Sequence, residues 1–145
     1  MTARESRQGA GPISKLEYVS ESGIESLVDE FYRRVRMDPK LAPIFERAIS
    51  GGDWSLHLAT MRDFWSSVML TSGRYKGNPV AKHLQLEGME PHLFEHWLDL
   101  FTQTCRELFD EEVAAAFAVK AQRIAESLKL ALFYRPDRPW PRTLP

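Results

Sequence analysis

The sequence contains little of what marks secreted or membrane-spanning proteins. Its one cysteine, Cys105, cannot form an internal disulfide, which fits a reducing compartment. The longest uncharged stretch, Phe64 to Gly73, has 10 residues and is too short to cross a bilayer. The first residues, MTARESRQGAGPIS, include no apolar signal region. These features predict a cytoplasmic protein without a membrane partner.

The chain also has almost no net charge. Its 19 lysines and arginines are balanced by 20 aspartates and glutamates, which gives a net charge of −1. A near-neutral chain has no electrostatic surface for polyanions, so we expect no nucleic-acid partner. The pattern offers no Ser–His–Asp set, phosphate-binding glycine loop, inward carboxylate pair or CxxC motif. Hydrolase, kinase and thiol-redox functions therefore have no support in the sequence.

Aromatic side chains are abundant. The 145 residues, enough for one domain with one core, include 16 aromatics, four of them tryptophans. Hydrophobic residues make up 43% of the chain and charged residues 27%, a balance that excludes a disordered chain. Aromatic side chains bury large areas, so the interior is either very full or built around a flat guest molecule.

The spacing of the apolar residues predicts an all-α fold. It is helical throughout residues 18–135, without convincing strand alternation, and indicates four long helices and two short ones. The expected helix starts carry residue types that cap a helix or favour its first turn: Ser22 (with Glu25 as a capping box), Asp53, Pro79, Pro91 and Asp110.

The two ends of the chain differ from this helical body. Residues 1–17 are polar and without periodicity, which predicts a flexible N-terminal arm. Residues 136–145 hold four of the nine prolines, which predicts a Pro-rich tail and an end of the last helix near Arg135. The predicted domain therefore spans residues 18–135.

Two histidines are candidates for a site. His57 lies within about 40° of the centre of the apolar face of its helix, so its imidazole is aimed into an aromatic interior. His83, in the segment KHLQL, lies on a separate short helix 26 residues later. Two histidines that approach a flat apolar cavity from opposite sides suit a haem iron, which one binds while the other faces the open position. The alternative for each is a structural histidine whose ring is bonded to a backbone carbonyl.

The other two histidines, His92 and His96, have the i, i+4 spacing of a metal-binding pair. Both point about 160–200° away from the apolar face of their helix, and no third ligand is evident. We therefore expect both on the surface, in contact with solvent.

Three further polar or reactive side chains have simple structural explanations. Tyr32 lies about 90° from the centre of its apolar stripe, as a boundary tyrosine with its hydroxyl in water does. Trp97 is central in its stripe, where core packing is the alternative to a site role. Cys105 shares that face and is interpreted as a small buried hydrophobic residue.

Four collinear stretches carry the strongest pattern: FYRRVRMDPKLAPIF at 31–45, WSLHLATMRDFW at 54–65, GNPVAKHLQL at 77–86 and PHLFEHWLDLF at 91–101. On these motifs the sequence resembles the group III truncated haemoglobins, over about residues 24–134. The resemblance implies a globin-like fold, a two-over-two helical sandwich that encloses haem b and its iron.

The resemblance also implies roles for individual residues. His83 matches the proximal iron ligand. Tyr32 and Trp97 match the distal tyrosine and tryptophan, and His57 matches the distal histidine, which acts as a gate in this group. The matches at pocket-wall positions are Phe31, Phe45, Met61 and Phe64.

The function implied is the binding of O₂, NO, CO or a similar small ligand. Hydrogen-bond donors at Tyr32 and Trp97 would slow O₂ release, which argues against bulk oxygen transport and for ligand chemistry or detoxification of NO or peroxide. A haem-dependent NO dioxygenase or peroxidase would need a separate reductase. The alternative is a non-haem helical interaction domain, a pseudo-globin whose aromatic residues only fill the core. The assembly state stays open.

Overall fold

The computed structural model describes residues 15–49, 53–83 and 88–133. In this part of the chain six helices follow one another. They are α1 (Glu21–Met37), α2 (Ala42–Ala48), α3 (Trp54–Leu70), α4 (Pro79–His83), α5 (Pro91–Leu108) and α6 (Glu111–Phe133). The predicted all-α fold with four long and two short helices is confirmed. No helix among these residues is long and apolar enough to cross a membrane.

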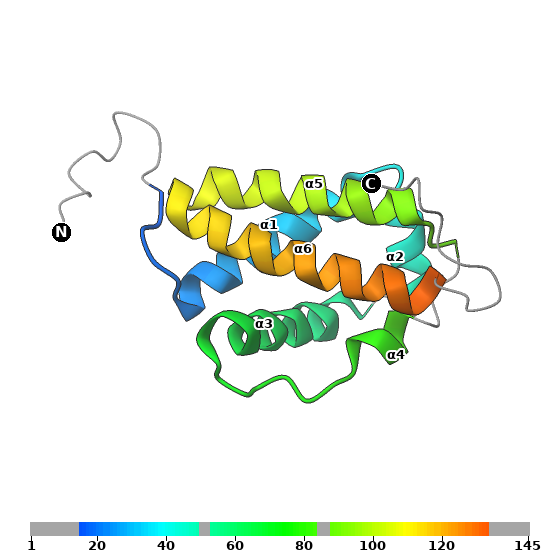
Figure 1. Cartoon of the computed structure of the whole chain (residues 1–145), viewed down its shortest axis with the longest axis horizontal. Helices are drawn as coiled ribbons and strands as arrows, with labels where there is room; N and C mark the ends of the chain where they lie inside the picture. Colours follow the sequence, from blue (N-terminus) through cyan, green and yellow to red (C-terminus); the bar gives the residue numbers. More distant parts are fainter. Residues whose placement is uncertain (1–14, 50–52, 84–87, 134–145) are drawn as a thin grey trace.

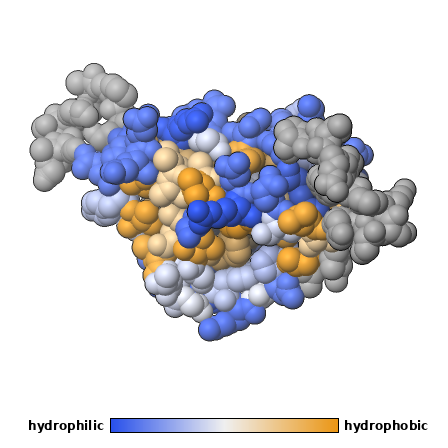
Figure 2. Space-filling view, viewed as in Figure 1, coloured by the Kyte–Doolittle hydropathy of each residue, from blue (hydrophilic) through white to orange (hydrophobic). Residues whose placement is uncertain are grey.

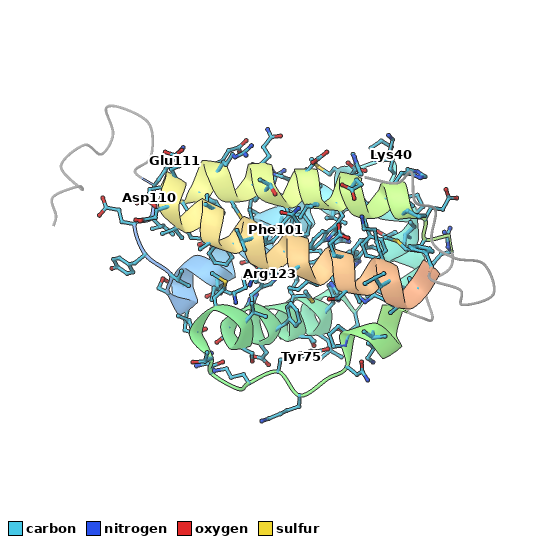
Figure 3. The ribbon with its side chains drawn as sticks, viewed as in Figure 1. Lys40, Tyr75, Phe101, Asp110, Glu111 and Arg123 are labelled. Atoms are coloured by element: carbon cyan, nitrogen blue, oxygen red, sulfur yellow. The ribbon has the colours of Figure 1, made fainter. Side chains whose placement is uncertain are left out.

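The predicted N-caps are confirmed at two of the long helices, α3 and α6. The Asp53 carboxylate accepts the backbone N–H of Leu56 at 3.1 Å at the start of α3. The Asp110 carboxylate accepts the N–H of Val113 at 3.1 Å before α6 (Figure 3). Each satisfies an amide that has no partner within the helix.

The predicted capping box at Ser22 is wrong. Helix α1 begins at Glu21, and its cap is Ser20, whose hydroxyl accepts the N–H of Gly23 at 3.0 Å. Ser20 is the last residue with extended backbone, φ −147° and ψ 164°, whereas Ser22 already belongs to the first turn. Only a residue outside the helix can turn its hydroxyl back onto the first free amides.

The long helices form two packed pairs. Helices α5 and α6 run antiparallel, joined by a short corner, and α1 packs along α3 and also contacts α5 (Figure 1). The short helix α4 packs against α6. This arrangement is the two-over-two sandwich that the resemblance implies.

Stacked aromatic rings join the two pairs in the core. The Phe101 ring on α5 lies between two indoles, with its centroid 4.9 Å from Trp65 and 5.4 Å from Trp97. Phe31 on α1 meets Phe101 edge-on at 5.2 Å. Phe31 and Phe101 are each 1% exposed. On the outer surface, apolar side chains gather over part of α6, where Val119 is exposed (Figure 2).

Leu16 lies within the predicted N-terminal arm, yet it pairs with the corner between α5 and α6. Its N–H donates to the Leu108 carbonyl at 3.0 Å, and its carbonyl accepts the Asp110 N–H at 2.9 Å. The regular structure of the domain therefore begins before residue 18. Residues 1–14 of the arm and the tail at 136–145 lie outside the described residues, as does the expected helix end near Arg135.

Candidate functional site

His83 is the last residue of α4, a short helix whose first residue is Pro79. Its Nδ1 lies 2.7 Å from the Pro79 carbonyl oxygen. A carbonyl can only accept, so Nδ1 carries the proton and donates it, which leaves Nε2 as the lone-pair nitrogen of the neutral ring. The same hydrogen bond holds the ring in place and raises its basicity as a metal ligand.

His57 lies on α3 inside a cage of aromatic rings. Its imidazole meets Tyr32 edge-on at 4.9 Å between ring centroids, Trp54 at 5.7 Å and Phe45 at 6.1 Å. Its Nε2 is buried and has no hydrogen-bond partner among the described residues. Burying a ring nitrogen without a partner is costly, so this atom is suited to a ligand that enters from outside the chain.

The surroundings of His57 also keep it uncharged. Burial, followed by repulsion from His83, lowers the pKa of the His57 imidazole to about 4. The imidazole is therefore neutral at pH 7.

Tyr32 is buried rather than placed at the boundary with water. It is 4% exposed, and its ring contacts those of Phe31 at 4.9 Å and Phe45 at 5.7 Å in addition to His57. The boundary interpretation is wrong because α2 and α3 cover the side of α1 that the periodicity leaves at the edge of its stripe. Burial raises the pKa of the phenol well above its usual value, so the hydroxyl keeps its proton as a donor.

Trp97 on α5 reaches the cage indirectly. Its indole is half-buried, stacks on Phe101 and meets Phe31 edge-on at 5.7 Å. Phe31 in turn contacts Tyr32. The Phe31 ring thus lies between Trp97 and the aromatic cage around His57.

The four predicted wall residues fall into two groups. Phe45 belongs to the cage around His57, and Phe31 contacts this cage through Tyr32. Met61 and Phe64 follow one and two turns later on α3 and are half-buried against the core. The ring contacts of Phe64 are with Trp65 and with Tyr75, in the loop after α3.

The sequence interpretation did not assign Trp54 to the site, although it packs directly against His57. It is 7% exposed and also stacks on Phe45 at 6.4 Å. Trp54 precedes His57 by three residues and therefore shares its helix face. The three-residue spacing in the sequence therefore indicates that Trp54 lies beside His57.

The two remaining histidines differ from each other. His92 is exposed and lies 3.4 Å from Glu90, as expected of a surface residue. His96 is not free in solvent: its Nε2 lies 2.7 Å from the Asp38 carboxylate. The side chain of His96 is still 32% exposed, so the predicted surface position is confirmed, and the turn after α1 supplies a partner that the sequence did not predict. In the described part of the chain no group of three or more His, Cys, Asp or Glu residues could hold a metal ion.

No protein-family model matches the chain. The group 3 truncated haemoglobin ctb of Campylobacter jejuni is 36% identical to it over 121 residues, which cover 82% of this chain and 95% of that protein. The crystal structure of a group III truncated haemoglobin from Campylobacter jejuni superposes with a TM-score of 0.79 at 35% identity, covering 83% of this chain and 96% of the other. The similarity therefore extends over nearly the whole length of both relatives and over about four fifths of this chain.

Proposed function

The chain belongs to the group III truncated haemoglobins, and we propose that it binds haem b through His83 and a diatomic ligand on the side of His57, Tyr32 and Trp97. The observation that carries the proposal is the pair of histidines on α3 and α4. One has its Nδ1 held by a carbonyl, and the other has a buried Nε2 without a partner in the described chain.

The residues present fit a haem. A protein site for a bare metal ion needs several side-chain ligands, and the described residues offer no such cluster. A haem brings four ligands of its own and needs only one imidazole from the protein, together with apolar walls. His83 is the proposed ligand, and the half-buried apolar residues of α3, such as Met61 and Phe64, are the proposed wall.

Haem iron held by His83 would supply an open coordination position for O₂, NO or CO. The residues proposed to face this open position would determine which ligand stays bound. Tyr32 offers an O–H group that burial keeps protonated, Trp97 offers an indole N–H group, and His57 offers a neutral imidazole. Donors of this kind stabilise a ligand that gains negative charge on binding and do little for neutral CO.

Two donors would slow the release of O₂, so the proposed role is ligand chemistry rather than bulk oxygen transport. Detoxification of NO or peroxide suits such a pocket, because polar donors help to polarise an O–O bond. Repeated turnover would need electrons from a separate reductase.

The first test is a haem titration followed by absorption spectra of the ferric, reduced and CO-treated protein. We expect a saturable, sharp Soret band that shifts with CO in the wild type and in His92→Ala, whose histidine is exposed. The His83→Ala variant should lose this histidine-ligated spectrum. A wild type without a saturable Soret band would reject the proposal and leave the non-haem interaction domain as the function.

A further inference from the structure

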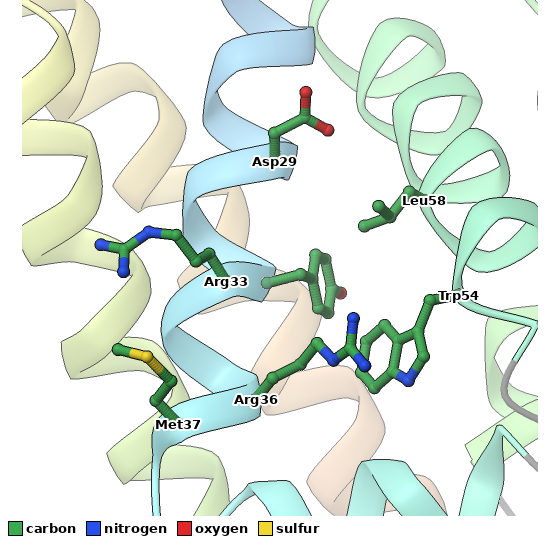
Figure 4. A pocket seen from close by; sticks show the side chains of 7 residues that line it. Asp29, Arg33, Arg36, Met37, Trp54 and Leu58 are labelled. Atoms are coloured by element: carbon green, nitrogen blue, oxygen red, sulfur yellow. The ribbon is translucent and has the colours of Figure 1, made fainter.

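A cavity of about 340 Å³ lies between α1 and α3. Its floor is formed by Tyr32, Trp54 and Leu58, and its rim carries exposed charged residues of α1, Arg36 among them (Figure 4). Apart from Tyr32, none of the residues that line this cavity was predicted as a site residue.

The floor of the cavity is also a wall of the site. Tyr32 and Trp54 line the cavity, and the same two rings contact the imidazole of His57 at 4.9 and 5.7 Å between centroids. These two rings therefore lie between the cavity and the imidazole of His57. Both rings are almost fully buried although the rim is exposed.

Arg36 covers this layer from outside. Its guanidinium lies 4.4 Å from the centre of the Trp54 ring, a cation–π contact that joins α1 to α3 (Figure 4). Arg33 and Met37 are exposed residues of α1 that also line this cavity. The indole is thus held closed over His57 by one exposed side chain whose own motion is fast.

We propose that this cavity is a docking and entry site for a neutral diatomic gas, and that Trp54, held by Arg36, is the movable wall between it and His57. The inference rests on the proposed function, since it concerns how the ligand reaches that site. An apolar, largely aromatic floor favours an apolar guest over water. A small rotation of one indole removes the barrier, whereas α1 and α3 stay packed.

The test is the second-order rate of CO binding after flash photolysis of the haem-loaded protein. Loss of an exposed cation–π contact should raise the open population, and with it the CO association rate of Arg36→Leu, about two- to fivefold. Trp54→Ala should raise the rate by at least as much. Arg123→Leu is the matched control, because Arg123 is an exposed arginine of α6 that does not line the cavity, and its rate should equal that of the wild type.

A second readout does not depend on kinetics. In the CO-bound protein, xenon under pressure should shift the NMR signals of the Trp54 indole and the Tyr32 ring in a saturable manner. A spectrum without such shifts would overturn the docking site. If Trp54→Ala does not take up haem, Arg36→Leu alone decides the test, because it changes only an exposed side chain.

The outcomes separate the two proposals. A wild type that binds no haem rejects the proposed function, and the entry site falls with it. A haem-loaded protein whose CO rate is unchanged in Arg36→Leu and Trp54→Ala, but raised in His57→Ala, keeps the function and overturns the entry site, since the gas then passes His57 directly.

Discussion

The ring of Tyr32 meets the imidazole of His57 at 89°, with the two centroids 4.9 Å apart. The contact joins α1 to α3 and brings a protonated phenol beside a neutral imidazole whose Nε2 is unpaired in the described chain. A donor and a potential acceptor thus face one region of the interior. A ligand bound there would be retained according to how well it accepts hydrogen bonds.

Tyr32→Phe should release O₂ faster from the reduced, haem-loaded protein. The substitution removes one hydroxyl and keeps the ring contacts, so the loss of a hydrogen bond to a charged acceptor should raise the dissociation rate about tenfold to a hundredfold. CO release should change little. Stopped-flow displacement measures both rates.

Tyr75→Phe is the matched control, because it also removes a phenol hydroxyl near α3 but contacts Phe64 rather than His57. Its O₂ release should equal that of the wild type. An unchanged O₂ dissociation rate in a Tyr32→Phe, Trp97→Leu double variant would contradict the proposed donor network.

His57 should make the folded chain sensitive to mild acid. Its pKa is about 4 in the folded protein, against 6.5 for the unperturbed group, so between these values the unfolded chain binds more protons than the folded one. The free energy of unfolding must therefore fall as the pH drops from 6.5 to 4, by at most about 1.4 kcal/mol per pH unit from this group. Urea unfolding of the haem-free chain at several pH values measures the slope.

His57→Leu supplies the comparison for that slope, since leucine does not titrate. Its stability should decline less steeply over the same pH range. Equal slopes for the variant and the wild type would mean that His57 is already able to take up a proton in the folded state.

His96→Ala should destabilise the fold by about 1 kcal/mol, because it removes the hydrogen bond to Asp38 that ties α5 to the turn after α1. The Asp38 carboxylate keeps two backbone partners, the N–H groups of Lys40 and Leu41, which limits the loss. His92→Ala, on the same helix but exposed, should stay within about 0.5 kcal/mol of the wild type. Equal stabilities of the two variants in urea unfolding would refute a role for the His96–Asp38 contact.

Cys105 should not react with a thiol reagent while the protein is folded. The residue is fully buried on α5, and burial raises the pKa of its thiol to about 12, so almost no thiolate is present at pH 8. Ellman's reagent should therefore label the chain only after urea unfolds it. Rapid labelling in native buffer would show that α5 separates from the core more readily than its packing indicates.

Local patterns in the sequence were enough to predict the helices. The caps at Asp53 and Asp110 and the start of α5 at Pro91 depend on a few neighbouring residues, so they could be recognised without a fold. The cap at Ser20 was missed because Ser20 and Ser22 are both capable caps, and only the direction in which the chain enters α1 decides between them.

The periodicity of α3 likewise predicted the direction of His57, since a residue's face on a helix follows from its spacing alone. The periodicity of one helix could not predict which side chains of the other helices lie against His57. The burial of Tyr32, the aromatic cage and the lone Nε2 of His57 arise where α1, α2 and α3 meet. The contact of His96 with Asp38 spans 58 positions in the sequence.

Local spacing therefore predicted the helices of the described residues and the apolar face of each long helix, and motifs shared with a family indicated His83 as the candidate ligand. The packing of the helices was needed to show that Tyr32 is a buried donor, that Trp54 lies between a cavity and His57 and that His96 is paired. The physical reason is that helix formation and facing depend on residues three or four positions apart, whereas burial, charge and access depend on which helices pack together.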